Sequence, residues 1–441
     1  MRELEYLTGF GSYFETEAVR GTLPEGRNSP QKAPRGLYPE QLSGSAFTMK
    51  RSENLRSWLY RVRPSVVQGE WTPNSHQKYW TSQVADDGQT PPQALRWLPL
   101  VSEESCDFLD GVKTMVANNA SEGSAVHHYV MNQSMNNKYF YNADGELVFI
   151  PQEGPLLLKT EMGSLYVEPL EVAVIPRGVK FCVEVTTSGS ANGSANGSTN
   201  NWSRGYLGEN TGAPLRLPEL GPIGSNGLAS PRDFQFPTAA FANSSTACEL
   251  FCKFQNRFWK TQLDHSPLDV VAWHGNYAPY KYDLRKFNTM GTISYDHPDP
   301  SIFTVLTSPS SVAGKANMDF VIFPPRWLVG EDTFRPPYFH RNLMNEYMGL
   351  IKGEYDAKKE GFLPGGASLH NCMVPHGPDG DTFEKELKRP EEPRKVDSTM
   401  AFMFESSQIY QVSSYALKEA PLDKKYWQCW QGLKNNFEAA K

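Results

Sequence analysis

The stretch DGELVFIPQEGPLLLKTEMGSLYVEPLEVAVIPRGVKFCVEV, residues 144–185, decides the fold class. Its apolar runs are short, and Gly, Pro or an Asp-Gly pair interrupts each of them after a few residues. Runs of this length with turn residues between them predict four or five short β-strands. Repeated along a chain, this pattern is typical of β-sandwiches and β-barrels.

The rest of the chain supports the same fold class. Its 441 residues include 33 Pro, 35 Gly and many aromatic residues, a composition that favours short strands joined by turns. Further buried strands are expected at IFTVLT (302–307), FVIF (320–323) and MAFMFESS (400–407). The sequence therefore predicts a mainly β protein of sandwich or barrel domains with a few peripheral helices.

The length favours more than one domain, and we expect a large N-terminal β domain (1–285) and a smaller C-terminal domain (286–441). Residues 1–75 look irregular, so they can be ordered only by wrapping over a core or a neighbouring subunit. The Ser/Gly/Asn-rich residues 186–203 have nothing to bury and predict a flexible surface insertion between strands.

Two charged or aromatic segments near the C-terminus are expected outside the main core. Residues 379–396 are strongly charged and predict a solvated loop or a short helix. Aromatic and apolar residues at near-helical spacing predict an amphipathic helix over residues 423–441, docked by Tyr426, Trp427, Trp430, Leu433 and Phe437.

Charge and motif content exclude several function classes. The net charge is −6 and no basic stripe occurs, so nucleic acid is not an expected partner. No run of about 18 apolar residues predicts a membrane span, and the first residues lack an apolar core of signal-peptide length. With six scattered cysteines, a reduced cytoplasmic compartment is expected. The GxxGxxG spacing at 221–227 lacks a preceding strand and a following helix, which favours an ordered loop over a nucleotide site.

A candidate metal site begins in FRPPYFHRNLMNE, residues 334–346, where His340 precedes Glu346 by six residues. Two histidines and a carboxylate can hold Fe(II) with open positions, and zinc accepts the same donors. In a straight strand the two residues would be about 20 Å apart, and on a helix they would lie on different faces. They can share an ion only if the chain folds back between them, and Arg341-Asn342 could start that turn.

A third ligand would come from LPGGASLHNCMVPHGPDG, residues 363–380, which offers His370 and His376. Four of the nine histidines lie between residues 297 and 376, more than an even spread would place there. The simpler interpretation stays open: His340 and Glu346 could be a surface polar pair, and His370 and His376 ordinary loop residues.

Long strings of the sequence resemble the homogentisate 1,2-dioxygenase family. They are LYPEQLSGSAFT (37–48), LGPIGSNGLASPRDF (220–234), VVAWHGNYAPYKYDLRKFNTMGTISYDHPDPSIFTVLTS (270–308), FRPPYFHRNLMNEYMGLIKGEYDAKKEGFLPGGASLHNCMVPHGPD (334–379) and TMAFMFESS (399–407). The resemblance runs in order over nearly the whole chain. The insertion at 186–203 is the clearest departure, because it is longer than the family pattern implies.

The resemblance implies a cupin-like (jelly-roll) β fold whose C-terminal domain carries a mononuclear Fe(II) site. His340, Glu346 and His376 match the family's three iron ligands. The resemblance also implies that the chain assembles as a homohexamer, a dimer of trimers. That assembly would give the irregular N-terminal segment a neighbour to wrap around.

Further site residues follow from the same resemblance. His297, in YDHPDPS, matches the histidine that accepts the proton of the substrate phenol. Tyr355 matches a residue that hydrogen-bonds homogentisate, and His376 borders the substrate as well as the iron. His370 matches a histidine close to the iron that is not one of its ligands.

The implied reaction converts homogentisate and O₂ to maleylacetoacetate, a step of tyrosine and phenylalanine catabolism. One alternative is a related dioxygenase for another hydroquinone, such as gentisate or a ring-substituted homogentisate. A cupin-like binding or storage protein without catalysis would lack at least one ligand, and here all three are present. A zinc hydrolase would bind zinc and take up no O₂.

Overall fold

The fold is that of a computed structural model that describes residues 4–75, 77, 79–84, 89–101, 105–186, 202–291, 294–355 and 361–437. Most regular structure in these residues is β-strand. The α-helices that they contain are short: α1 (Phe108–Gly111), α2 (Gly380–Glu386) and α3 (Ser414–Lys418). The prediction of a mainly β protein with few helices is confirmed. The insertion predicted at 186–203 falls almost wholly outside the described residues.

The central layer is a nine-stranded sheet, as counted over the described residues. Its strands, in spatial order, are β1 (Tyr6–Thr8), β16 (Phe234–Pro237), β20 (Tyr280–Asp283), β13 (Glu171–Ile175), β10 (Glu146–Glu153), β15 (Ser203–Asn210), β8 (Ser124–Met131), β7 (Val112–Ala117) and β28 (Gln411–Val412). Every residue of β8 and nearly every residue of β15 is buried, so neither shows an exposed polar face. Strands buried on both faces belong to a sheet that is covered on both sides.

A seven-stranded sheet covers one face of the central layer. Its described strands, in spatial order, are β12 (Gly163–Val167), β11 (Leu156–Thr160), β14 (Phe181–Val185), β9 (Lys138–Asn142), β17 (Cys248–Phe254), β18 (Arg257–Leu263) and β5 (Thr72–Asn74). Phe149 of the central sheet meets Phe181 of this sheet with ring centroids 5.8 Å apart. The five strands β10 to β14 all come from residues 144–185, which confirms the strands predicted there.

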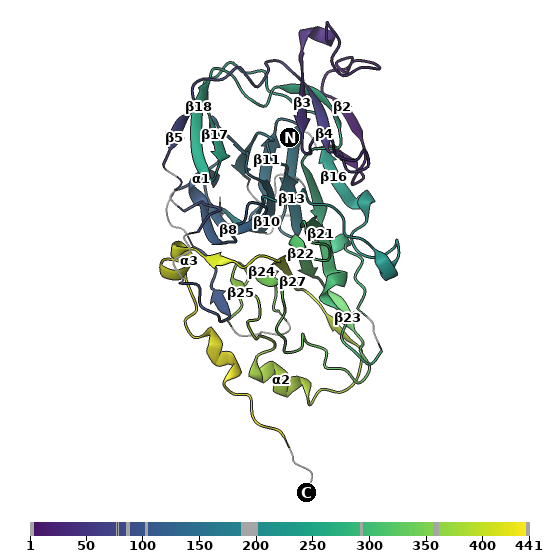
Figure 1. Cartoon of the computed structure of the whole chain (residues 1–441), viewed down its shortest axis with the longest axis vertical. Coiled ribbons are helices and arrows are strands. Elements are labelled where there is room, and N and C mark those ends of the chain that lie inside the picture. Colours follow the sequence, from purple (N-terminus) through teal and green to yellow (C-terminus); the bar gives the residue numbers. More distant parts are fainter. Residues whose placement is uncertain are drawn as a thin grey trace.

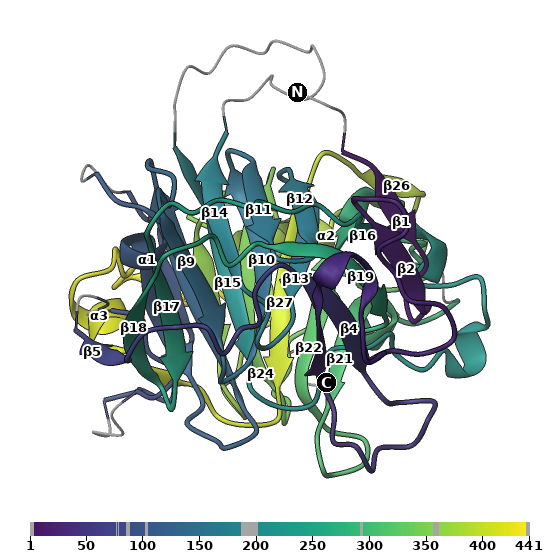
Figure 2. The ribbon, with the colours of Figure 1, turned by 90° about the horizontal axis from the view of Figure 1, so that it is seen from above.

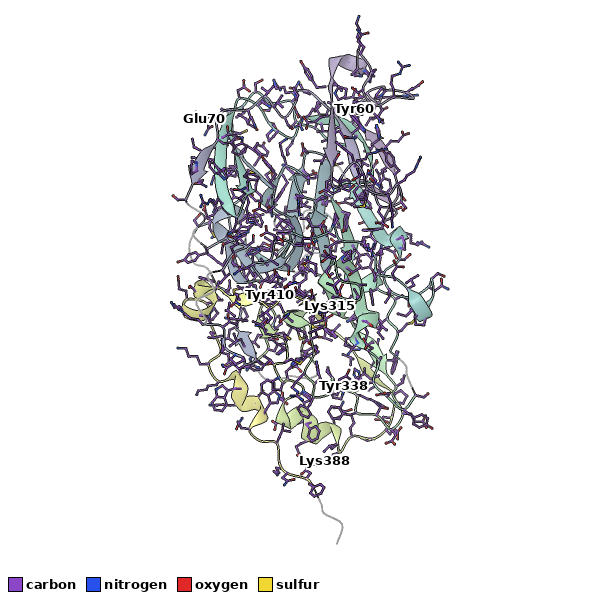
Figure 3. All side chains as sticks on the ribbon, viewed as in Figure 1. Tyr60, Glu70, Lys315, Tyr338, Lys388 and Tyr410 are labelled. Carbon is purple, nitrogen blue, oxygen red and sulfur yellow. The ribbon has the colours of Figure 1, made fainter. Side chains whose placement is uncertain are left out.

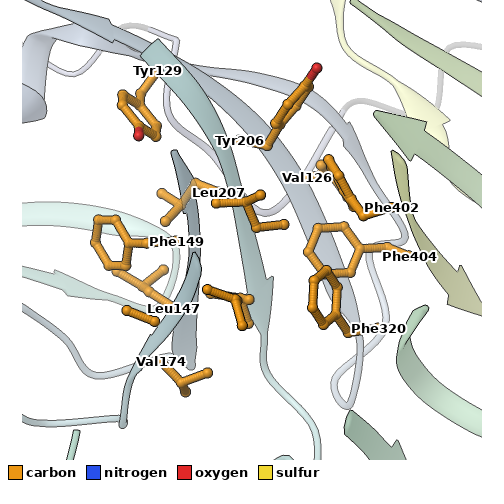
Figure 4. Packing of buried hydrophobic residues seen from close by; sticks show 14 of the residues in the cluster. Val126, Tyr129, Leu147, Phe149, Val174, Tyr206, Leu207, Phe320, Phe402 and Phe404 are labelled. Atoms are coloured by element: carbon orange, nitrogen blue, oxygen red, sulfur yellow. The ribbon is translucent and has the colours of Figure 1, made fainter. Parts of the chain in front are cut away.

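A six-stranded sheet covers the other face. Its described strands, in spatial order, are β21 (Thr304–Pro309), β22 (Ala316–Phe323), β27 (Met400–Ser406), β24 (Asn345–Lys352), β25 (Ala367–His370) and β6 (Leu95–Trp97). Tyr206 of the central sheet packs on Phe402, with ring centroids 4.8 Å apart, and Phe404 and Phe320 extend this layer of rings (Figure 4). A Cβ on Gly208 would lie 2.6 Å from the Phe404 ring, so only glycine permits this approach.

The N-terminal segment is ordered by pairing with the rest of its own chain. A four-stranded sheet of described residues joins β2 (Phe14–Glu17), β19 (Val270–Gly275), β4 (Arg56–Arg61) and β3 (Tyr38–Ser43). These N-terminal strands gather on one side of the molecule (Figures 1 and 2). The segment is therefore more regular than its Gly- and Pro-rich sequence predicts, because strands β16, β18 and β19, more than 150 residues away, pair with it.

The two halves of the chain exchange strands. Residues 95–97 form β6 at the edge of the six-stranded sheet, where Leu95 lies opposite Leu369. In return, residues 411–412 form β28 at the edge of the central sheet, beside β7. A two-stranded ribbon of β23 (Arg326–Leu328) and β26 (Arg394–Val396) completes the C-terminal half.

The amphipathic helix predicted at the C-terminus is wrong. Residues Tyr426–Trp430 form a short 3₁₀ helix, η6, and residues 433–437 have no regular structure. Gly432 and the two asparagines that follow are weak helix formers. The aromatic residues also do not share one docked face, because Tyr426 is buried while Trp427 and Phe437 are exposed.

Candidate metal centre

Glu346 lies at the start of β24, directly opposite His370 at the end of β25. Directly opposite residues of an antiparallel pair point to the same face of the sheet. The next residue, Tyr347, points the other way and its hydroxyl lies 2.8 Å from Nε2 of His128 in the central sheet. Glu346 and His370 therefore face away from the central sheet, toward the loops that precede β24 and follow β25.

His340 and His376 are held side by side by those loops. The two residues exchange backbone hydrogen bonds of 2.9 Å and 3.1 Å, which form an isolated β-bridge beyond the end of the β24–β25 pair. The chain folds back between His340 and Glu346. The amide of Asn342 donates to Glu346 Oε1 at 2.5 Å, and the Asn342 carbonyl accepts from the Met373 backbone N–H. Figure 3 shows Tyr338, just before this turn, toward the end of the molecule that carries the C-terminus.

The three candidate ligands converge on one point. Nε2 of His376 lies 3.0 Å from Glu346 Oε2, and Nε2 of His340 lies 3.5 Å from Glu346 Oε1. The ligand atoms of all three residues lie within 4.8 Å of one another. His370 adds a fourth group: its Nδ1 lies 3.4 Å from Glu346 Oε2, and its ring stacks on His376 with centroids 4.1 Å apart.

The carboxylate of Glu346 is buried, with 5% of the residue exposed. Burial by itself would raise the pKa of this group, but its contacts with the three histidines hold the pKa well below its usual range. Among the described residues, every ion-pair partner of Glu346 is a histidine. A buried carboxylate needs a compensating positive charge, and no lysine or arginine in the described part of the chain supplies a permanent one.

The Nδ1 contacts of His340 and His376 indicate which kind of ion this site can bind. Nδ1 of His340 lies 2.7 Å from the Tyr338 carbonyl, and Nδ1 of His376 lies 2.9 Å from the Val374 carbonyl. A carbonyl only accepts, so each neutral ring carries its proton on Nδ1 and turns the lone pair of Nε2 toward Glu346. Two lone pairs and a carboxylate repel one another unless a cation lies between them. The donor set therefore fits a divalent ion such as Fe(II) or Zn(II).

Glu405 stands beside the site, although sequence reasoning did not single it out. It lies on β27, directly opposite Glu346 on one side and Asp319 on the other. Burial, followed by the charges of Glu346 and Asp319, raises the pKa of Glu405 to about 8. A neutral Glu405 at neutral pH spares Glu346 a second adjacent negative charge. The one available signal was that this carboxylate directly follows the apolar run MAFMF, residues 400–404.

His297 lies beside the cluster and reaches it through Tyr338. The Tyr338 ring lies edge-on to His297 at 5.6 Å and to His340 at 5.4 Å. The two ring nitrogens of His297 lie 3.1 Å from the Arg335 carbonyl and 2.8 Å from the Pro298 carbonyl. A protonated ring would therefore find an acceptor for each of its N–H groups. His297 also lines a small cavity of about 20 Å³.

Tyr355 is buried just after β24. Its ring packs against Phe323 and Phe362, with centroids 5.7 Å and 6.0 Å away. Tyr355 and Glu346 both lie close enough to Tyr426 to raise the pKa of that phenol further, after the larger effect of burial. Tyr355 therefore belongs to the surroundings of the cluster. Tyr426 is a neighbour that no pattern in the sequence predicted.

The fold and this site define a mainly β protein that carries a His–Glu–His cluster, with Glu346 and His376 buried and His340 half-buried, suited to a divalent metal ion. The chain belongs to the homogentisate 1,2-dioxygenase family. Two family profiles match it end to end: Homogentisate 1,2-dioxygenase N-terminal over residues 5–284 and Homogentisate 1,2-dioxygenase C-terminal over residues 285–437. A relative from Pseudomonas fluorescens (strain Pf0-1), named homogentisate 1,2-dioxygenase, is 55% identical over 441 residues, 99% of this chain and 98% of the relative.

Solved structures with a distant likeness include a cupin domain protein and an oxalate decarboxylase. A cupin 2 conserved barrel domain protein from Leptotrichia buccalis has a TM-score of 0.28 and 9% identity, covering 75% of this chain and 99% of its own. A mutant of the Bacillus subtilis oxalate decarboxylase OxdC has a TM-score of 0.28 and 10% identity, covering 77% of this chain and 89% of its own. At these scores the likeness says nothing about the chemistry of this chain. Among the described residues, no helix combines the length and hydropathy needed to cross a bilayer.

Proposed function

We propose that this member of the homogentisate 1,2-dioxygenase family opens the aromatic ring of homogentisate with O₂, giving maleylacetoacetate, and that it holds Fe(II) on His340, Glu346 and His376. The observation that carries the proposal is the buried carboxylate of Glu346, which faces two imidazole lone pairs and has no lysine or arginine partner among the described residues. Iron(II), when bound there, would supply a Lewis acid for a phenol oxygen and a path for electrons between the ring and O₂.

His297 is proposed as the acceptor of the phenol proton. The carbonyl oxygens of Arg335 and Pro298 lie where they would accept from both N–H groups of the protonated ring. These contacts would fix the orientation of the ring, and the proton-acceptor role itself follows from the family resemblance. Tyr338, in contact with both His297 and His340, would keep the proton acceptor and the metal ligand at a fixed separation.

Tyr355 is proposed to hydrogen-bond the substrate, with His376 bordering substrate and metal alike. The aromatic packing of Tyr355 against Phe323 and Phe362 would hold its phenol in one orientation. His370, stacked on His376, would support the ligands without binding the ion.

The remaining proposals concern the metabolic pathway, the cell compartment and the oligomeric state. We place the reaction in tyrosine and phenylalanine catabolism, in the cytoplasm, and the working form as a homohexamer built as a dimer of trimers. The hexamer agrees with large apolar side chains left exposed on one chain, among them Phe47, Val66, Tyr295 and Trp327.

The direct test is oxygen consumption by protein loaded anaerobically with Fe(II). Homogentisate is added to the aerated sample while absorbance follows maleylacetoacetate. Uptake of one O₂ per homogentisate, with product formed, is the expected result. Iron retention without uptake would shift the proposal to another hydroquinone, and gentisate is the first to try. Retention of zinc with no O₂ uptake would point to a hydrolase instead.

The role of His297 predicts a separate result. His297→Ala is expected to retain iron, because the residue is not in the ligand set, and to lose turnover by about 10²- to 10⁴-fold, the range for a lost general base. Iron content per chain and the rate of O₂ uptake are measured on the same sample. An unchanged rate would remove His297 from the reaction.

A further inference from the structure

The C-terminal segment closes over the ligand loops from the side opposite the central sheet. Its 3₁₀ helix η6 begins at Tyr426, which is 1% exposed and packs against Ala94 and Val374. At the other end of η6, the indole N–H of Trp430 donates to the Pro378 carbonyl at 3.0 Å, two residues after His376. The segment therefore holds the loop that carries His376 at two points.

Tyr426 reaches the metal cluster directly. Its hydroxyl lies 3.2 Å from Nε2 of His370. The opposite nitrogen of the same ring, Nδ1, lies 3.4 Å from Glu346 Oε2, and the ring face stacks on His376 at an interplanar angle of 7°. His370 thus connects one phenol to two of the three candidate ligands.

Tyr426 is itself fixed by an ion pair from the N-terminal half. Arg96, on β6, donates from Nε at 3.0 Å and from Nη2 at 2.5 Å to Asp423 Oδ2. Its guanidinium carbon lies 4.4 Å from the centre of the Tyr426 ring. The Asp423 backbone N–H also donates to the Arg96 carbonyl at 2.8 Å. A stacked arginine with two bonds to one carboxylate leaves the phenol little freedom to turn.

The chemistry of these contacts sets the tautomer of His370. A tyrosine hydroxyl keeps its proton at neutral pH, so the buried Tyr426 phenol can donate it to Nε2 of His370. Nε2 of a neutral His370 then accepts that bond, which places the ring proton on Nδ1, facing Glu346. With the other tautomer, a lone pair on Nδ1 would face the carboxylate and push it away.

We propose that Tyr426, clamped by Arg96 and Asp423, is a positioning residue that sets the ring orientation and tautomer of His370 and thereby holds Glu346 and His376 ready for the metal. The proposal rests on the metal centre proposed above. It assigns a role in that centre to residue 96 of the N-terminal half and to the last described turn of the chain.

The test is Tyr426→Phe, which removes one oxygen atom and keeps the ring. The matched control is Tyr60→Phe, because Tyr60 is also buried and its hydroxyl lies 3.1 Å from Nε2 of another histidine, His274, in the N-terminal half. Fe(II) affinity is measured anaerobically on the full-length protein by competition with a chromogenic chelator, with no substrate present. Tyr426→Phe is expected to bind Fe(II) about 10-fold or more weakly, and Tyr60→Phe within about 2-fold of the parent.

A double variant separates positioning from a general structural effect. In a His370→Gln background, Tyr426→Phe should change Fe(II) affinity no further, because the phenol acts through His370. Arg96→Lys, which lacks the planar guanidinium that donates from two nitrogens to Asp423 Oδ2, should give an intermediate loss.

The outcomes are distinct. Parent-like affinity in Tyr426→Phe would overturn the positioning role and leave the metal centre standing, as would a full additional loss in the His370→Gln background. A parent protein that binds no Fe(II) would overturn the metal centre, and the positioning role with it.

Discussion

Two buried glutamates, Glu209 in the N-terminal half and Glu346 in the C-terminal half, hold the same charge in different ways. Glu209 Oε1 accepts from the Lys253 ammonium at 2.7 Å, and Lys253 is wholly buried between the central and seven-stranded sheets. His127 Nε2 lies 3.2 Å from Glu209 Oε2. Glu346 has histidines at similar distances and, among the described residues, no lysine.

The pKa values follow this difference. Burial would raise the pKa of Glu209, but Lys253 first and His127 second hold it far below the usual range. Burial, opposed by Glu209, lowers the pKa of His127, so this histidine is neutral and serves as a donor. In the Glu209 cluster the positive charge is a side chain of the protein, the ammonium of Lys253. In the other, the described residues leave the positive charge to protonated histidines or an added ion. The first cluster is therefore suited to stability and the second to metal binding.

The largest difference between the Glu346 and Glu209 clusters is expected from Glu346→Gln. This change keeps the shape of the side chain and removes its charge. Iron should no longer be retained, and turnover should fall by roughly 10³-fold or more, equal to about 4 kcal/mol of transition-state stabilisation. The metal-free variant should unfold at the same temperature as the metal-free parent, or higher, because a buried charge without a permanent partner has been removed. Iron content, O₂ uptake and thermal unfolding in chelator are the measurements. Stoichiometric iron in this variant would refute the ligand assignment.

The reciprocal change, Lys253→Met, should act on stability and not on the metal. It leaves Glu209 and Asp144 without their cation, and breaking a buried ion pair in this way costs about 3–5 kcal/mol in free energy of unfolding. Urea denaturation measures the loss, and iron per folded chain should match the parent. The double variant with Glu209→Gln should recover part of the loss. A loss below about 1 kcal/mol would mean that water already solvates this cluster.

Local patterns explain which parts of the fold the sequence could predict. The strands of residues 144–185 form as expected because apolar runs and turn residues specify them without distant partners. The C-terminal helix fails because Tyr426 and Trp430 are held by Arg96, His370 and Pro378, far away in sequence. β6 was not predicted because three residues carry no periodic signal, and only its pairing with β25 defines it.

The features of the candidate site also divide into those that the sequence could predict and those that it could not. Spacing alone required a fold-back between His340 and Glu346, and the Asn342 contacts supply it. The choice between His370 and His376 as third ligand came from family resemblance and not from spacing. Glu405 lies beside Glu346 only through sheet register. Strand register and long-range closure are the information that one sequence read locally does not contain.

The smallest effect in this comparison is expected from Ser82→Ala. The Ser82 hydroxyl donates to Glu209 Oε2 at 2.8 Å and accepts from Lys253. Its loss should cost about 1 kcal/mol in free energy of unfolding, the net contribution of one such hydrogen bond, with iron content and O₂ uptake unchanged. The cost stays small because Glu209 keeps Lys253, His127 and the amide of Asn142, which donates at 2.7 Å. A drop in bound iron would show instead that the two clusters are coupled through the central sheet, where His127 faces Glu209 and the adjacent His128 contacts Tyr347 beside Glu346.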